Sequence, residues 1–156
     1  MVRITTRGRY ALRASVALAR LQKQGSPVSI NHLAEVEDIS SVFLEQIFFK
    51  LRKAGIVNSV RGPGGGFCFA KAPEHLTIKE ILVAAGEELE LAACDKRIVS
   101  CKRVVTCTSH TVWEEVTGIV NKYFSDLTLD MVVKREDPAQ TGQVEFDEKV
   151  LSGESA

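Results

Sequence analysis

The chain has 156 residues, of which 45% are hydrophobic and 26% are charged. This length suits one compact domain, or a small domain with an appended helix, and the composition is ordinary for a globular protein. No apolar stretch approaches the roughly 18 residues of a membrane span, and the N-terminus lacks the apolar core of a signal peptide. We therefore expect a cytoplasmic protein that does not contact a membrane. Its four cysteines are expected to serve as ligands or redox groups rather than as disulfides.

The net charge of zero conceals an uneven distribution. Residues 1–71 contain 11 Lys and Arg against 4 Asp and Glu, a net charge of +7. Residues 72–134 contain 7 against 10, a net of −3, and residues 135–156 contain 2 against 6, a net of −4. A basic first half is typical of a protein that binds nucleic acid, although a solvated charged face would show the same excess.

The first part of the chain predicts three helices. Apolar residues at helical spacing indicate a helix from Thr6 to Gln22, which ends before Gly25-Ser26-Pro27. Ser29 is suited to cap a short second helix. Ser40 is suited to cap a third helix that runs to about Ala54, where Gly55 ends it.

Two short β-like runs follow the third helix, at residues 56–60 and 67–70. The glycine-rich segment Arg61-Gly62-Pro63-Gly64-Gly65-Gly66 joins them, which is a strong hairpin signal. The order helix, helix, turn, helix and hairpin is that of a winged helix-turn-helix. We therefore predict a mainly α fold with a small β-hairpin wing, and a DNA-binding domain over residues 1–86.

Three further segments complete the predicted organisation. A helix from Leu76 to Gly86 closes the first domain, and a cysteine-containing loop spans residues 87–108. A long helix starts near Ser109 and a short one follows it, so that residues 109–134 form a predicted dimerisation region. Residues 135–156 are rich in Glu, Asp, Gly and Ser and predict a disordered acidic tail.

The long helix carries large apolar residues at spacings of three and four, a pattern typical of a seam for a partner helix. Packing within the monomer would use the same pattern. A chain this short has few other helices to cover so large an aromatic stripe, which favours a homodimer. The residues expected at the dimer contact are Trp113, Val116, Val120, Tyr123 and Leu127.

The third helix is predicted to enter the major groove of DNA with its N-terminal residues at the base edges. Gln46 can read adenine and Glu45 can accept a hydrogen bond from cytosine, although an exposed Glu45 would also be stabilised by the helix dipole. The wing glycines would let the backbone approach a phosphate, and Arg61 would enter a narrow minor groove. The expected DNA-binding residues are Arg9, Val42, Glu45, Gln46, Lys50, Arg52, Arg61, Gly62, Gly64 and Gly65.

The loop and the start of the long helix contain Cys94, Cys101, Cys107 and His110, in the pattern Cys-x6-Cys-x5-Cys-x2-His. Structural zinc usually requires a closer pair of cysteines, so the spacing fits zinc poorly. Soft thiolates with open spacing suit an iron–sulfur cluster. A zinc site and a regulatory disulfide remain alternatives. Cys68, in the second β-like run, is expected to be a small buried hydrophobe.

No arrangement of nucleophile and base, or of paired carboxylates, is recognisable in the sequence. We therefore expect no enzyme activity and no small-molecule substrate. An iron–sulfur carrier or scaffold that binds DNA only incidentally is a further alternative, and the basic first half and the wing argue against it.

Several segments resemble the IscR/NsrR-type winged-helix regulators. The similarity runs from about residue 1 to 133, and the glycine-rich wing within this order of elements is highly specific. Residues 107–113 are similar to the IscR branch of that family. The other segments that carry the resemblance are residues 6–11, 43–48, 51–55 and 60–67.

The resemblance implies a homodimer, joined through the long helix, that binds imperfect palindromes of double-stranded DNA and controls genes of iron–sulfur cluster assembly or iron homeostasis. It implies that Glu45 and Gln46 read DNA, and that Glu45 helps to gate which class of site is accepted according to the state of the cluster. It also implies a 2Fe–2S cluster. The implied ligands are Cys94, Cys101, Cys107 and His110.

The sequence departs from the IscR branch in two places. The gap of six residues between Cys94 and Cys101 is one longer than in the IscR pattern. Related nitric-oxide and iron sensors, some with 4Fe–4S clusters, use similar three-cysteine loops, so a 4Fe–4S cluster is the alternative. Val42 stands where serine is common in the IscR branch, and a different DNA sequence preference is therefore expected.

Overall fold

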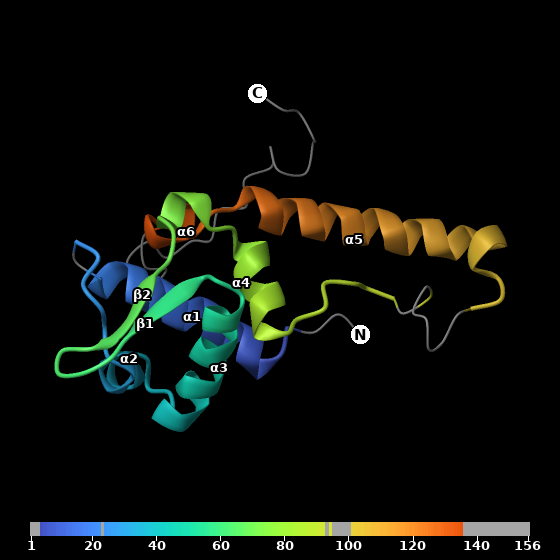
Figure 1. Ribbon diagram of the computed structural model, residues 1–156. Coiled ribbons are helices and arrows are strands. Elements are labelled where there is room, and N and C mark those ends of the chain that lie inside the picture. The colour runs from blue at the N-terminus through green and yellow to red at the C-terminus, as the bar shows by residue number, and fades with distance from the viewer. Residues whose placement is uncertain (1–3, 23, 93, 95–100, 136–156) are drawn as a thin grey trace.

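The computed structural model describes residues 4–22, 24–92, 94 and 101–135. Its secondary structure is mainly helical, with one antiparallel pair of strands and two short 3-10 helices. Figure 1 shows helices α1 to α4 and the hairpin gathered at one end, with α5 extending beyond them. The elements are α1 (Thr6–Leu21), α2 (Ile30–Glu37), α3 (Ser41–Lys53), β1 (Val57–Val60), β2 (Gly66–Phe69), η1 (Pro73–His75), α4 (Ile78–Ala85), η2 (Val104–Thr106), α5 (Thr108–Asp126) and α6 (Leu129–Val133).

Local sequence sets most helix ends. The Ser29 hydroxyl accepts a hydrogen bond from the backbone N–H of His32 at 3.2 Å, which confirms the predicted cap of α2. Thr77 and Glu80 form a reciprocal capping box at the start of α4. Ser40 occupies the N-cap position of α3, but its side chain makes no capping hydrogen bond, so that detail of the prediction is wrong.

The Glu80 carboxylate in this capping box is held by several donors. Burial raises the pKa of Glu80, but hydrogen bonds from Lys71 and Thr77 lower it, and the pKa lies below its ordinary value. Glu80 therefore stays ionised and keeps the start of α4 ordered.

The hydrophobic core lies between α1 and the helices packed around it, which are α2, α3, α4 and α6. Leu18 of α1, Leu51 of α3 and Ile81 of α4 are each fully buried in one continuous cluster. Phe48 is also fully buried, and its ring packs 5.0 Å from that of Phe67 in the hairpin. This packing fixes the buried face of α3 and leaves the opposite face toward solvent.

The hairpin is joined to the helical part by main-chain hydrogen bonds. β1 pairs with β2 so that Val57 lies opposite Phe69 and Val60 opposite Gly66. The first predicted run started one residue too early, since β1 begins at residue 57, and the second was displaced by one residue, since β2 covers 66–69. Val28, in the loop before α2, exchanges two hydrogen bonds with Phe67, of 2.9 and 2.8 Å. The wing therefore has a fixed attachment beside the helix-turn-helix.

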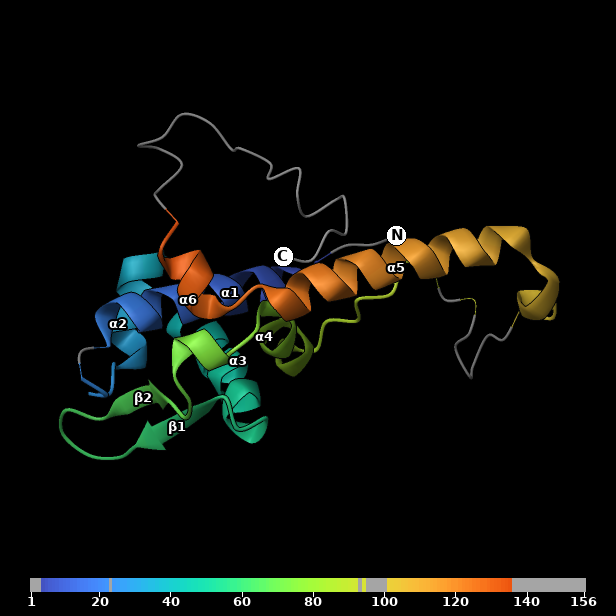
Figure 2. The same ribbon diagram turned by 90° about the horizontal axis from the view of Figure 1, so that it is seen from above.

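Helix α5 is anchored at its C-terminal end and projects away from the core at the other, as both views show (Figures 1 and 2). Phe124 and Leu127 pack against the core cluster, and Leu129 of α6 is fully buried. None of the residues of α5 is buried, and Trp113 and Ile119 are 44% and 54% exposed. Within the described residues, no helix is both long and apolar enough to cross a membrane.

Candidate DNA interface and cluster site

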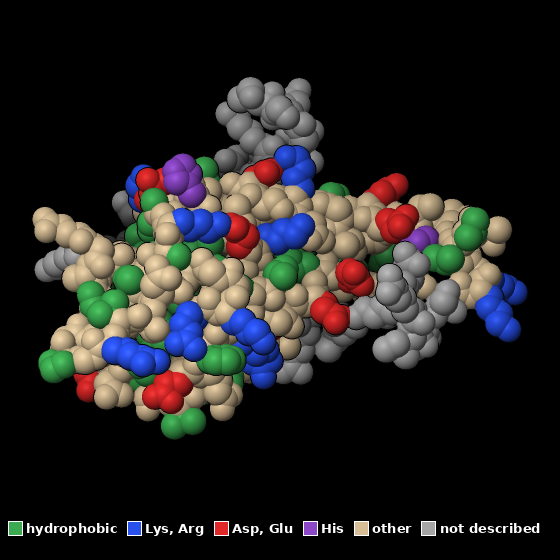
Figure 3. All heavy atoms as spheres, in the orientation of Figure 1, with side chains coloured by type: hydrophobic (Ala, Val, Ile, Leu, Met, Phe, Trp, Pro, Cys, Tyr) green, Lys and Arg blue, Asp and Glu red, His purple; other side chains and the backbone are tan. Residues whose placement is uncertain are grey.

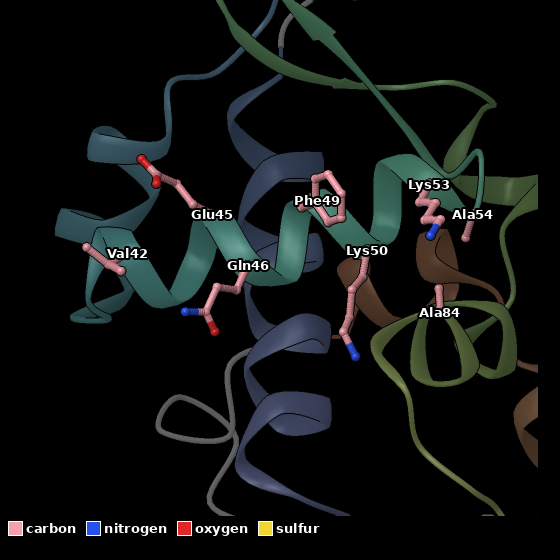
Figure 4. A pocket seen from close by; sticks show the side chains of 8 residues that line it. All are labelled: Val42, Glu45, Gln46, Phe49, Lys50, Lys53, Ala54 and Ala84. Atoms are coloured by element: carbon pink, nitrogen blue, oxygen red, sulfur yellow. The ribbon is translucent and has the colours of Figure 1, made fainter.

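One face of α3 is open to solvent along the whole helix. Val42 is 63% exposed and Phe49 is 55% exposed. These residues, with Glu45 and Gln46, lie along a groove of about 930 Å³ that continues to Ala84 of α4 (Figure 4). The full lining is Val42, Glu45, Gln46, Phe49, Lys50, Lys53, Ala54 and Ala84.

This face combines the polar side chains of Glu45 and Gln46 with positive charge. Lys50 donates a hydrogen bond to the carbonyl of Ala85 at 3.4 Å, at the C-terminal end of α4. Arg52 donates to the hydroxyl of Ser59 at 3.2 Å, and its guanidinium lies 5.5 Å from the centre of the Phe49 ring. Figure 3 shows Lys and Arg side chains gathered on the face that carries α3 and the hairpin. Such a face is electrostatically suited to a phosphate backbone.

The tip of the wing is shaped by glycine. Gly62 and Gly64 have φ values of +93° and +72°, which other residues adopt only with strain. A Cβ on Gly65 would lie 2.3 Å from the carbonyl oxygen of Val60, so this position has no room for a side chain. Arg61 is exposed beside this turn. The glycines are therefore required by the turn itself, and Arg61 is the residue of the tip that carries charge.

The predicted DNA-binding residues thus lie at three places in the structure: on α3, at the tip of the wing and on α1. Those of α3 share one open face, and those of the wing share its tip. Arg9 lies on the exposed side of α1, where its guanidinium donates to the Thr6 hydroxyl at 3.2 Å. The sequence did not predict that Phe49, Lys53 and Ala84 line this groove. The helical spacing of residues 42, 45, 46, 49 and 53 could have indicated the two in α3.

The backbone of the cysteine-rich segment brings the predicted ligands near one another in pairs. The N–H of Cys101 donates to the carbonyl of Cys94 at 3.2 Å, and that of His110 donates to the carbonyl of Cys107 at 3.0 Å. Cys107 is the N-cap residue of α5. Residues 95–100, between the first two cysteines, lie outside the described part. Among the residues that the structure describes, no group of three or more His, Cys, Asp or Glu side chains is arranged to hold a metal ion.

His110 has an unusual environment for a residue near the free end of a helix. Its side chain is only 14% exposed, and Nε2 lies 3.3 Å from Oε1 of Glu114. Nδ1 is buried and has no hydrogen-bond partner in the described part of the chain. Leaving a buried polar nitrogen unpaired costs about 1–3 kcal/mol. An imidazole nitrogen available for coordination, together with three thiols on the same short segment, fits the donor set of an iron–sulfur cluster.

The residues of the predicted dimer seam lie in two different environments, exposed or half-buried on the projecting part of α5, or packed against the core of the same chain. Trp113 is exposed near the start of α5, and Val116 and Val120 are half-buried. Tyr123 accepts a hydrogen bond from Arg135 at 3.2 Å, while Leu127 packs on the core of its own chain. The projecting part of α5 is therefore the part available to a partner.

The segment of residues 87–91, here called the strap, joins α4 to the cysteine-rich segment along the side of α5. The carbonyl of Leu89 accepts a hydrogen bond from Asn121 at 3.1 Å, and the N–H of Leu91 donates to the hydroxyl of Thr117 at 3.2 Å. Leu89 is also buried. The strap is thus held directly by the helix whose first turn carries His110.

The other end of the strap holds the N-terminus of α1. Glu87 is 7% exposed, and its carboxylate accepts hydrogen bonds from the backbone N–H of Thr5, at 3.0 Å, and from the Thr5 hydroxyl. A Cβ on Gly8 would lie 2.6 Å from the Glu87 side chain, so a larger residue at this position would displace the carboxylate from Thr5. A negative charge at a helix N-terminus is favourable. The strap therefore connects α5 physically to the first helix of the DNA-binding part.

Comparison with known proteins assigns the chain to a family. The family model described as "Rrf2: Iron-dependent Transcriptional regulator" matches residues 4–135. The chain belongs to the Rrf2 family. It is 35% identical over 133 residues to the HTH-type transcriptional regulator IscR of Vibrio atlanticus, an alignment that covers 85% of this chain and 76% of the relative.

Two solved structures show the same architecture as this Rrf2-family chain. IscR of T. potens matches with a TM-score of 0.70 and 29% identity, covering 92% of this chain and 94% of the other. CymR, the global cysteine regulator of B. subtilis, matches with a TM-score of 0.73 and 26% identity, covering 88% and 100%. These matches confirm the predicted winged-helix fold and the resemblance to IscR. The Rrf2-family relatives are transcriptional regulators and not enzymes, and this chain is accordingly a DNA-binding transcriptional regulator.

Proposed function

We propose that this Rrf2-family regulator binds palindromic DNA as a homodimer, in the cytoplasm, under the control of an iron–sulfur cluster. The buried, unpaired Nδ1 of His110, one turn from Cys107, is the observation that carries the cluster assignment. A 2Fe–2S cluster is preferred and a 4Fe–4S cluster is the alternative. Genes of cluster assembly or iron homeostasis are the proposed targets. The proposed ligands are Cys94, Cys101, Cys107 and His110.

The residues of this segment suit a negatively charged group. Cys107 stands at the N-terminus of α5, where the helix dipole favours negative charge on its sulfur. Lys102 and Arg103 are exposed in the same segment, between Cys101 and Cys107 in the sequence, and would offset the charge of thiolate ligands. When bound, the cluster supplies a redox-sensitive and removable link between the cysteine-rich segment and α5.

The strap provides the physical route from this segment to DNA. Its hydrogen bonds to α5 and its carboxylate on Thr5 tie the cluster end of the molecule to the N-terminus of α1. α1 packs directly against α3. We propose that the cluster-loaded and cluster-free forms favour different positions of α5, and hence a different spacing of the two recognition helices in the dimer.

The open face of α3 is proposed to lie in the major groove. Gln46 can make a bidentate contact with adenine, Glu45 can select cytosine, and the exposed Val42 can contact a thymine methyl group. Arg61 at the wing tip is proposed to enter the adjacent minor groove. Base contacts on α3 would set specificity, and phosphate contacts from the wing and from Arg9 would set affinity.

Substitutions at Gln46 and Arg61 are expected to have different effects on DNA binding. Gln46→Ala should cost about 1–3 kcal/mol per half-site and relax discrimination at one base pair. Arg61→Ala should weaken binding to all sequences and reduce the salt dependence. Fluorescence anisotropy on a palindrome selected from a random pool would measure both effects. Lys122→Ala, which removes a charge from exposed α5, is the control. Unchanged discrimination in Gln46→Ala would contradict this assignment.

The projecting part of α5 is the proposed dimer contact. Trp113→Ala is expected to raise the dimer dissociation constant about 30-fold, because a central aromatic residue contributes about 2 kcal/mol or more to such contacts. Sedimentation velocity over a concentration series measures this constant. Val105→Ala removes an apolar group that is 93% exposed outside α5 and serves as the control. Equal sedimentation of Trp113→Ala and the unsubstituted protein would exclude this face.

A regulator that senses through its thiols is the second candidate. The backbone hydrogen bond between Cys94 and Cys101 favours it, because it places two cysteines on adjacent stretches of chain. Anaerobic purification, followed by a visible spectrum and assays of iron, sulfide and zinc, separates the candidates. Iron and sulfide in equal amounts support the cluster. Zinc alone, or no metal together with a reversible disulfide, supports one of the alternatives.

A further inference from the structure

His110 and Glu114 form a pair one turn apart on α5, in which the two imidazole nitrogens have different surroundings. Nε2 lies 3.3 Å from Oε1 of Glu114, whose side chain is 66% exposed. Nδ1 is buried without a partner among the described residues. The carboxylate therefore meets the outer nitrogen, and the inner nitrogen is left without a donor or acceptor.

This asymmetry selects one form of the ring. A neutral imidazole carries a single N–H, on one nitrogen or the other. With the proton on Nε2, the ring donates to Glu114 and leaves the Nδ1 lone pair free on the buried side. With the proton on Nδ1, the buried N–H would be unpaired and Nε2 would present its lone pair to a carboxylate. The first form is favoured on both counts.

We propose that Glu114 is a positioning residue for the cluster: it holds the His110 proton on Nε2 and so presents Nδ1 as the coordinating atom. Metal-binding histidines commonly donate their other N–H to a carboxylate, which fixes the form and orientation of the ring. This inference rests on the proposed function, because it needs His110 to be a ligand.

A simple surface ion pair does not explain the arrangement. Lys122 and Asp126 form such a pair on the same helix, with side chains that are 70% and 64% exposed. Pairs of that kind contribute little to stability. The His110 side chain is instead 14% exposed, and a surface ion pair would not leave a buried nitrogen unpaired. The burial of Nδ1 is the feature that points to a ligand on the inner side.

The first test uses the cluster-free protein and does not depend on cluster binding. Long-range proton–nitrogen NMR of histidine-labelled protein at alkaline pH reports which ring nitrogen carries the proton. The unsubstituted protein should show His110 protonated on Nε2, and Glu114→Leu should show a mixture of the two forms. Glu114→Gln retains a carbonyl acceptor and should restore the first form. The same spectrum in Glu114→Leu as in the unsubstituted protein would overturn the positioning role.

The second test measures the lifetime of the cluster after anaerobic reconstitution. Loss of visible absorption in the presence of an iron chelator should be about 10- to 100-fold faster in Glu114→Leu than in the unsubstituted protein. Glu114→Gln should remain close to the unsubstituted protein. Glu115→Leu makes the same change at the neighbouring exposed position and is the matched control.

The two tests separate this inference from the function on which it rests. Equal lifetimes in Glu114→Leu and the unsubstituted protein, both of which hold a cluster, would overturn only the role of Glu114. Absence of iron and sulfide from the unsubstituted protein would overturn the cluster itself, and the ligand role of His110 with it. Circular dichroism should show the same helix content in every variant, since Glu114 is on the exposed side of α5.

Discussion

Replacing Cys107 by alanine is expected to abolish the visible absorption of the anaerobically purified protein. Cys107 stands at the N-cap of α5, and its carbonyl accepts a hydrogen bond from the N–H of His110. Its sulfur is therefore proposed to be the cluster ligand that lies between the two loop cysteines and His110. Among the described cysteines, Cys107 alone stands at the start of α5. Iron and sulfide content should fall together with the absorption, while the fold should persist because Cys107 lies outside the hydrophobic core.

Cys68→Ala is the matched control for Cys107→Ala. Cys68 is half-buried in β2, where it lies opposite Asn58 and away from the cysteine-rich segment. Its replacement should leave the spectrum and the iron content unchanged. If Cys107→Ala kept its absorption, or if Cys68→Ala lost it, the proposed ligand set would be wrong.

Gly66→Ala is expected to lower the free energy of unfolding by about 3 kcal/mol and to weaken DNA binding. The φ angle of Gly66 is +149°, and a Cβ there would lie 2.1 Å from the carbonyl oxygen of Val28 and 2.7 Å from the nitrogen of Ser29. These are backbone atoms, so the clash can be relieved only by moving the hairpin. The two hydrogen bonds between Val28 and Phe67 would be lost with it.

Chemical denaturation measures the change in stability for Gly66→Ala, and anisotropy measures the DNA affinity of the fraction that remains folded. Gly118→Ala is the matched control, because a Cβ on Gly118 meets nothing within 4 Å. That change should stabilise α5 by about 0.5–1 kcal/mol, since alanine is the better helix former. Equal stability of Gly66→Ala and the unsubstituted protein would show that the wing is not attached through this contact.

Local patterns in the sequence were sufficient to predict the helices and the wing. Gly55 and Gly86 end α3 and α4 in the left-handed conformation that their position required. The hairpin followed from the glycine-rich segment 61–66. The Ser40 hydroxyl was predicted to accept a capping hydrogen bond at the start of α3, but residue type indicates only the preference for that position and not the orientation of the hydroxyl. Cys68 is half-buried rather than buried, because a two-stranded hairpin has no second layer to cover it.

Features that depend on contacts between distant residues could not be predicted. The apolar seam of α5 gave no indication that Leu127 packs within the monomer while Trp113 remains exposed, because periodicity does not identify the partner of a face. Glu87 was not recognised, since its hydrogen-bond partner Thr5 is 82 residues away in the sequence. The acidic tail predicted for residues 135–156 lies outside the described residues except for Arg135.

The candidate cluster site could be predicted only in part from the sequence. The spacing of the cysteines and His110 predicted a ligand set, and the structure adds the buried Nδ1 that the spacing could not reveal. The spacing of four residues between His110 and Glu114 was visible in the sequence. It became informative only once the two imidazole nitrogens were seen in different surroundings.

The most direct test of the central proposal compares the DNA affinity of the cluster-loaded and cluster-free forms. Both would be titrated onto the same selected palindrome at one fixed salt concentration, with Cys107→Ala as a permanently cluster-free reference. We expect the loaded form to differ from the cluster-free form by about 5- to 150-fold, the usual range of coupling between two sites, and Cys107→Ala to match the cluster-free form. Equal affinities for the two forms, or binding that is salt-sensitive but indifferent to sequence, would contradict a cluster-controlled regulator.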